Sequence, residues 1–83
     1  PSASFLFTAY GYTLHIRDEL VADAFASLPE QEQGILILHC VLELADGEIG
    51  SLVGMSRSAV QRHRTKALNE LRKRLEDERR NPK

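Results

Sequence analysis

The segment "GEIGSLVGMSRSAVQRHRTKAL" runs from Gly47 to Leu68. Its first half is apolar and punctuated by glycine, and its second half is crowded with cations. Two helices joined by the tight turn "VGMS" fit this pattern, because Gly54 can take the left-handed conformation that closes one helix and Ser56 can cap the next. Gly50 lies midway in the first helix, where the lack of a side chain lets the second helix approach. The stretch therefore predicts a helix-turn-helix.

The second helix of this motif is predicted to present a cationic leading end. A helix enters the DNA major groove with that end toward the bases, where arginine can bind guanine and glutamine can bind adenine through paired hydrogen bonds. We therefore expect the polar side chains near the start of the helix to read bases: Arg57, Ser58, Gln61 and Arg62. The cations farther along are expected to contact phosphates: Arg64, Lys66, Arg72 and Lys73.

The positive charge of the chain is concentrated in this same region. The 83 residues have a net charge of −1, but residues 1–56 carry −7 and residues 57–83 carry +6. A basic tract beside an acidic body fits a polyanionic partner, and a solvated charged helix would give the same count. The helix-turn-helix spacing favours the first of these interpretations, which is nucleic-acid binding.

The chain as a whole predicts an all-α fold, with a four-helix helix-turn-helix DNA-binding domain over residues 17–77. Residues 1–16 form an N-terminal extension rich in aromatic and β-branched side chains. We expect this extension to be extended or irregular, with a short hairpin around Gly11 as one possibility. Residues 78–83 are expected to form a frayed basic tail. The length allows one small domain with a modest core.

Polar residues ahead of each apolar stripe predict where the helices begin. Asp18 is expected to cap a first helix over about residues 18–27. In "SLPE", Ser27 is expected to be the N-cap of the second helix and to form a capping box with Glu30, ahead of a buried apolar block. Asp46 is expected to cap the third helix.

Composition and spacing argue against catalytic, metal-binding and membrane functions. No apolar run approaches the length of about 20 residues that a membrane span needs, no signal peptide is visible, and we expect a cytoplasmic protein without membrane contact. Cys40 is alone in an apolar segment, so we expect a buried, inert thiol. We expect no cofactor, no metal and no enzymatic activity, because the histidines lack the spacing of a metal site: His15, His39 and His63.

The segments "LPEQEQGILIL", "ADGEIGSLVGMSRSAV" and "KALNELRKRL" together resemble region 4 of the sigma-70 family of bacterial RNA polymerase specificity factors. The resemblance covers about residues 27–75. It implies a module whose recognition helix reads the −35 element of double-stranded promoter DNA and whose surface binds the flap of the polymerase β subunit. Arg57 would correspond to an arginine that contacts bases or backbone. An anti-sigma factor or another regulator is a further possible partner.

Two residues depart from the primary members of that family, which commonly have glutamate at the position of Ser58 and arginine at that of Gln61. These differences indicate a divergent, alternative or mobile-element-encoded factor, and they leave the promoter sequence open. His63 replaces an aliphatic residue, and we expect it to pack partly buried. Two other interpretations stay open: the output domain of LuxR-type regulators, which shares the pattern from Glu48 to Val60, and a protein-interaction module whose basic helix is only a solvated face.

Overall fold

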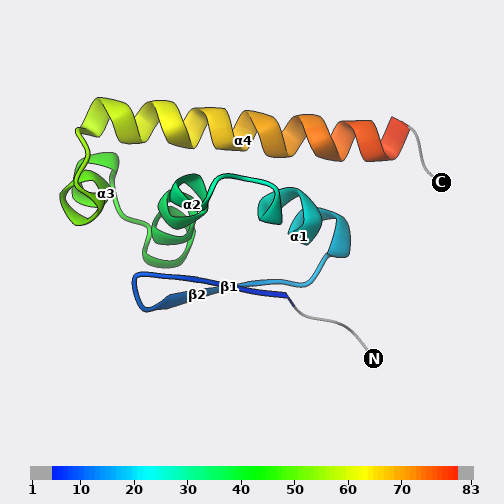
Figure 1. Ribbon diagram of the computed structural model, residues 1–83, viewed down its shortest axis with the longest axis horizontal. Coiled ribbons are helices and arrows are strands. Elements are labelled where there is room, and N and C mark those ends of the chain that lie inside the picture. The colour runs from blue at the N-terminus through cyan, green and yellow to red at the C-terminus, as the bar shows by residue number, and fades with distance from the viewer. Residues whose placement is uncertain (1–4, 81–83) are drawn as a thin grey trace.

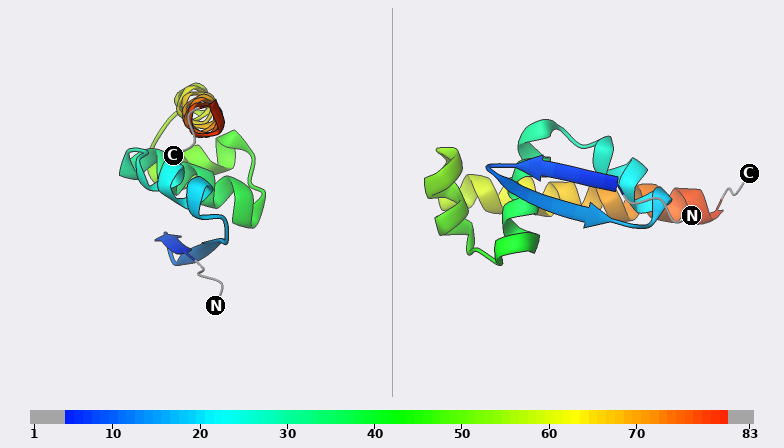
Figure 2. Two further views of the ribbon diagram at one scale, coloured as in Figure 1. Left: turned by 90° about the vertical axis from the view of Figure 1, so that its right-hand side faces the viewer. Right: turned by 90° about the horizontal axis from the view of Figure 1, so that it is seen from below.

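The structure is a computed structural model that describes residues 5–80, and the side chains of residues 5–77. Its elements follow one another as β1 (Phe5–Ala9), β2 (Tyr12–Ile16), α1 (Glu19–Ala26), α2 (Glu30–Leu42), α3 (Asp46–Val53) and α4 (Arg57–Arg80). Figure 1 shows three layers, with α4 along one side, α1 to α3 in the middle and the strands on the far side of α1 and α2. Figure 2 shows the same layers end-on. The predicted four-helix fold is confirmed.

The N-terminal segment is a regular antiparallel hairpin. Ala9 pairs with Tyr12, and the turn between them places Tyr10 and Gly11 at φ values of 53° and 82°. Two consecutive positive φ values are typical of the two-residue turns that match strand twist. The predicted extension is therefore extended but not irregular, because alternate residues bury an apolar face against the helices: Phe7, Ala9, Leu14 and Ile16.

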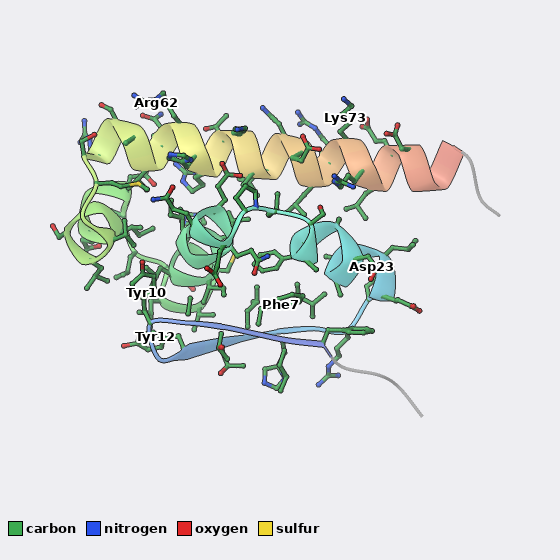
Figure 3. The ribbon with its side chains drawn as sticks, in the orientation of Figure 1. Phe7, Tyr10, Tyr12, Asp23, Arg62 and Lys73 are labelled. Carbon is green, nitrogen blue, oxygen red and sulfur yellow. The ribbon has the colours of Figure 1, made fainter. Side chains whose placement is uncertain are left out.

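Helix α2 is central, because it supplies residues to both apolar clusters. One cluster joins α1, α2 and α4 above the hairpin: Phe25, Leu28, Leu36, Ile37 and Ala67. Phe7 of the hairpin packs edge to face on Phe25, with ring centroids 4.6 Å apart (Figure 3). The other cluster joins α2, α3 and α4: Ile35, Leu38, Ile49 and Val60. The second cluster holds the start of α4 against α3.

The caps of the first two helices are partly as predicted. Asp18 is confirmed as the N-cap of α1, since its Oδ1 accepts hydrogen bonds from the N–H groups of Leu20 at 2.8 Å and Val21 at 3.2 Å. The prediction for Ser27 was wrong. This residue has helical φ and ψ and ends α1, and its hydroxyl donates to the Ala24 carbonyl. An N-cap needs extended backbone, and Pro29 provides it for α2.

The cap of α3 also differs from the prediction. Asp46 is the first helical residue and Ala45 is the N-cap. The carboxylate that satisfies the helix start is that of Glu48, which accepts a hydrogen bond of 2.9 Å from the Ala45 N–H. Asp46 is therefore available for another partner. The predictions for the turn are confirmed: Gly54 has a φ of 78°, and the Ser56 hydroxyl accepts from the Ala59 N–H at 3.1 Å.

Two further predictions need correction. The predicted burial of Cys40 is wrong, because this residue is exposed. The hairpin packs against the apolar cluster that includes Leu36 and Ile37 of α2, and Cys40, near the end of the same helix, is not part of that cluster. Partial desolvation still raises the pKa of the Cys40 thiol. Residues 78–80 continue α4 instead of beginning a frayed tail, and the remainder of that predicted tail, residues 81–83, lies outside the described residues.

Candidate nucleic-acid interface

The turn between α3 and α4 is held by one carbonyl group. The Gly50 carbonyl accepts hydrogen bonds from the N–H of Gly54 at 2.8 Å and from that of Met55 at 2.9 Å. A Cβ added to Gly50 would overlap the carbonyl oxygen of Met55. The glycine was expected to admit the second helix, and the structure shows that the backbone of the turn is what approaches it. This close turn fixes where α4 starts.

One side of α4 faces away from all the other elements. Figure 3 shows Arg62 and Lys73 projecting from α4 on the side opposite α1 to α3. Seven of the eight predicted contact residues are exposed: Arg57, Ser58, Gln61, Arg62, Lys66, Arg72 and Lys73. The motif therefore carries most of its predicted contact residues where a duplex could reach them.

The exposed side chains of α4 are arranged in rows, because a helix turns by about 100° per residue. We use the term outer face for the exposed surface of α4 formed by these rows. Its middle row carries uncharged hydrogen-bonding groups: Ser58, Gln61, Thr65 and Asn69. One flank is cationic: Arg62, Lys66 and Lys73. Arg57 lies at the other edge of this surface, and Arg72 continues the middle row toward the end of the helix. Groups that can pair with base edges thus lie beside groups that can pair with phosphates.

Two residues of the middle row, Thr65 and Asn69, are not among the predicted contact residues. Both line a shallow hollow along the helix, together with Gln61 and Arg62. Asn69 is held in place, since its Oδ1 accepts a hydrogen bond of 2.8 Å from Arg72. The spacing of three or four residues that links Ser58, Gln61, Thr65 and Asn69 was the available signal.

Arg64 differs from the other predicted contact residues, because it is engaged within the fold. Its Nε and Nη2 atoms donate to the two carboxylate oxygens of Asp46 in α3, both at 2.8 Å. The two side chains are only 23% and 18% exposed. The hydrogen bond from Arg64 lowers the pKa of the Asp46 carboxyl, and the same bond raises the pKa of Arg64. The pair ties α4 to the first turn of α3.

Arg57 is exposed, but the aliphatic part of its side chain also packs against α3. A Cβ added to Gly47 would lie 3.7 Å from Cδ and 4.0 Å from Cγ of Arg57. The aliphatic part of Arg57 therefore crosses α3 at a position without a side chain. The positive charge of Arg57 also contributes to the lowered pKa of Asp46.

A second polar pair joins α4 to α2. Glu32 is a buried carboxylate, 3% exposed, and its Oε2 lies 3.1 Å from Nδ1 of His63. With a proton on Nδ1 the imidazole donates to this oxygen. The expectation of a partly buried His63 is confirmed. Its polar partner was not predicted, since Glu32 is separated from it by 31 positions.

Within residues 5–80 no helix combines the length and the apolar character needed to cross a membrane. Over the same range, no group of three or more histidine, cysteine or carboxylate residues is placed to hold a metal ion.

Comparison with known proteins gives two matches. The sequence model of the family described as "Sigma-70, region 4" matches residues 18–71, which include α1 to α3 and most of α4. The RNA polymerase sigma factor FliA of Pseudomonas aeruginosa is 42% identical over 57 residues, which are 69% of this chain and 23% of that protein. The chain thus matches less than a quarter of the length of this relative. No solved structure shows significant similarity to the chain.

Proposed function

Because the chain belongs to the sigma-70 region 4 family, whose members bind DNA in transcription initiation, we propose that it recognises a −35 promoter element through the outer face of α4. The family is one of non-enzymatic DNA-binding modules, and the proposal needs no catalytic group. The similarity to a region of an RNA polymerase sigma factor supports the same role.

The observation that carries this proposal is the arrangement of the outer face. Uncharged donors and acceptors form most of its middle row, a cationic flank runs along one side of that row, and Arg57 lies at the other edge near the start of the helix. Non-specific affinity for DNA comes from cations at phosphates, and sequence preference comes from groups at base edges. A helix that served only as a solvated charged surface would not need this separation into rows.

The roles of the residues follow from their exposure and from their distance along α4 from the start of the helix. Base reading is assigned to the leading half: Arg57, Ser58, Gln61, Arg62 and Thr65. Phosphate contacts are assigned to the exposed cations farther along the helix: Lys66, Arg72 and Lys73. Arg64 is assigned to holding α4 on α3, because its Nε and Nη2 atoms both donate hydrogen bonds to Asp46.

RNA polymerase is the proposed protein partner, through the flap of its β subunit, as the family resemblance implies. Ser58 and Gln61 stand where primary factors commonly have glutamate and arginine, which supports an alternative or divergent promoter specificity. An anti-sigma factor or another regulator is a possible additional partner. The family match favours this assignment over a LuxR-type output domain.

The proposal is tested by selecting bound sites from a random pool of duplex DNA. We expect the wild-type protein to enrich one motif and Gln61→Ala to relax it at one or two base pairs, since each paired contact supplies about 1–3 kcal/mol of discrimination. Lys73→Ala should keep the motif and weaken binding to all sequences alike.

The matched control for Lys73→Ala is Arg74→Ala. Both substitutions remove one positive charge, but Arg74 lies 3.5 Å from Glu70 as an i, i+4 pair and points away from the outer face. The slope of log affinity against log salt should fall in magnitude by about 0.9 for Lys73→Ala and stay unchanged for Arg74→Ala. If the wild type enriches no motif, the protein-interaction module replaces promoter recognition as the function.

A further inference from the structure

Asp46 lies at the point where the recognition helix meets the rest of the fold. It begins α3, and it accepts both hydrogen bonds from the fork of Arg64 in α4. Glu48 satisfies the start of α3 instead of Asp46. The carboxylate of Asp46 therefore has no capping role. Its hydrogen bonds to Arg64 instead help to set how α4 packs on α3.

The same carboxylate is close to the charge of a second arginine of α4. Arg57 crosses α3 at Gly47, the residue after Asp46, and its charge acts on the Asp46 carboxyl. Arg57 and Arg64 are seven residues apart, which is about two helical turns, so they lie on the same side of α4. One acidic residue thus faces the two arginines along this edge of the helix.

We propose that Asp46 is a positioning residue for DNA recognition, which keeps Arg64 off the phosphates and fixes the rotation of α4 about its axis, so that Arg57 and Gln61 point at bases. This inference rests on the proposed DNA-binding function. A bidentate pair suits the task, because two parallel hydrogen bonds fix the relative orientation of two groups as well as their distance.

The proposal predicts an unusual combination of effects for Asp46→Asn. Arg64 is released and can reach a phosphate, so the salt slope should grow in magnitude by about 0.9 and non-specific binding should strengthen. The start of α4 loses its fixed rotation, so the ratio of specific to non-specific affinity should fall by about fivefold or more, the lower limit of what one paired base contact supplies. Loss of stability alone would weaken both kinds of binding.

Glu48→Gln is the matched control. It removes the same charge from the same turn of α3, and the amide oxygen of glutamine can still accept the hydrogen bond from Ala45. Arg64→Lys is the second variant, because lysine keeps the charge but cannot form the bidentate pair. It should reproduce the effects of Asp46→Asn if that variant folds poorly. Asp46→Glu restores a carboxylate and should recover part of the ratio.

The experiment measures binding to the selected motif and to a scrambled duplex over a range of salt concentrations, at a temperature where circular dichroism shows every variant to be folded. Equal ratios and slopes for Asp46→Asn, Arg64→Lys and Glu48→Gln would overturn the positioning role while leaving promoter recognition intact. A wild-type protein that prefers neither duplex would instead overturn the proposed function and this inference together.

Discussion

Replacing Gly50 by alanine should destabilise the domain, although alanine is the better helix former. In an ordinary helix interior this substitution gains about 1 kcal/mol. Here the new Cβ would overlap the backbone oxygen of Met55, and backbone cannot rotate aside as a flexible side chain can. The turn would have to move away from α3. This movement would stretch the two hydrogen bonds that the N–H groups of Gly54 and Met55 donate to the Gly50 carbonyl.

The magnitude follows from these opposing contributions. Overpacking of this kind costs about 1–3 kcal/mol, and weakening one of the two hydrogen bonds adds about 1 kcal/mol. After the gain in helix propensity, we expect a net loss of about 1–3 kcal/mol. For a domain of this size each kcal/mol corresponds to about 4–8 °C, so the melting temperature should fall by roughly 5–20 °C.

Gly47→Ala in the same helix is the control. A Cβ there would meet only side-chain atoms of Arg57, at 3.7 Å and 4.0 Å, which is ordinary van der Waals contact. Its melting temperature should equal or exceed that of the wild type. Thermal unfolding followed by far-ultraviolet circular dichroism compares the two variants. A Gly50→Ala protein that melts at or above the wild-type temperature would refute the close turn.

Three other outcomes are expected. Val60→Asp should unfold the domain, because Val60 is fully buried and an unpaired carboxylate there costs several kcal/mol against a small total stability; an unchanged melting temperature would show that the core is elsewhere. Arg64 holds the pKa of Asp46 below its ordinary value, so their pair stabilises the fold above the unfolded-state pKa of about 3.9 and loses this effect as the pH falls through the folded-state pKa. The difference in melting temperature between wild type and Arg64→Gln should therefore shrink below about pH 4, and a constant difference would contradict it. Cys40 is exposed and its thiol has a raised pKa, so alkylation of the folded protein should be slow at neutral pH and accelerate as the pH rises, whereas complete protection would contradict the exposure.

The parts of the fold that were predictable are those set by nearby residues. The left-handed Gly54, the Ser56 cap and the Asp18 cap each depend on atoms within one turn of helix. Signals of this range are present in the sequence itself. They are enough to place α3, the turn and the start of α4, and with them the predicted contact residues.

Local signals also explain the wrong capping predictions. Ser27 precedes Pro29 and Glu30, as a capping box requires, but α1 continues as far as Ser27 and its hydroxyl bonds back to Ala24. Ser27 could end α1 or begin α2, and the capping-box pattern alone favours the start of α2. The backbone conformation at Pro29 decides the outcome.

Pairs between distant residues were beyond the reach of the sequence. Asp46 and Arg64 are 18 positions apart, and Glu32 and His63 are 31 apart. From the sequence alone, each acidic residue is explained by the favourable effect of a negative charge in the first turn of its own helix. Only the packing of α2 and α3 on α4 shows that each has a partner, and that Arg64 is bound within the fold.

DNA recognition by α4 is tested by an NMR titration of the isotopically labelled protein with duplex DNA that carries the selected motif. The amides and side chains of the outer face of α4 should shift in a saturable manner: Arg57, Ser58, Gln61, Thr65 and Lys66. The outward residues Leu6 and Thr13 of the hairpin, on the opposite side of the molecule, should not move. Shifts that gather on the hairpin, or that spread evenly without saturation, would contradict the claim that α4 reads DNA.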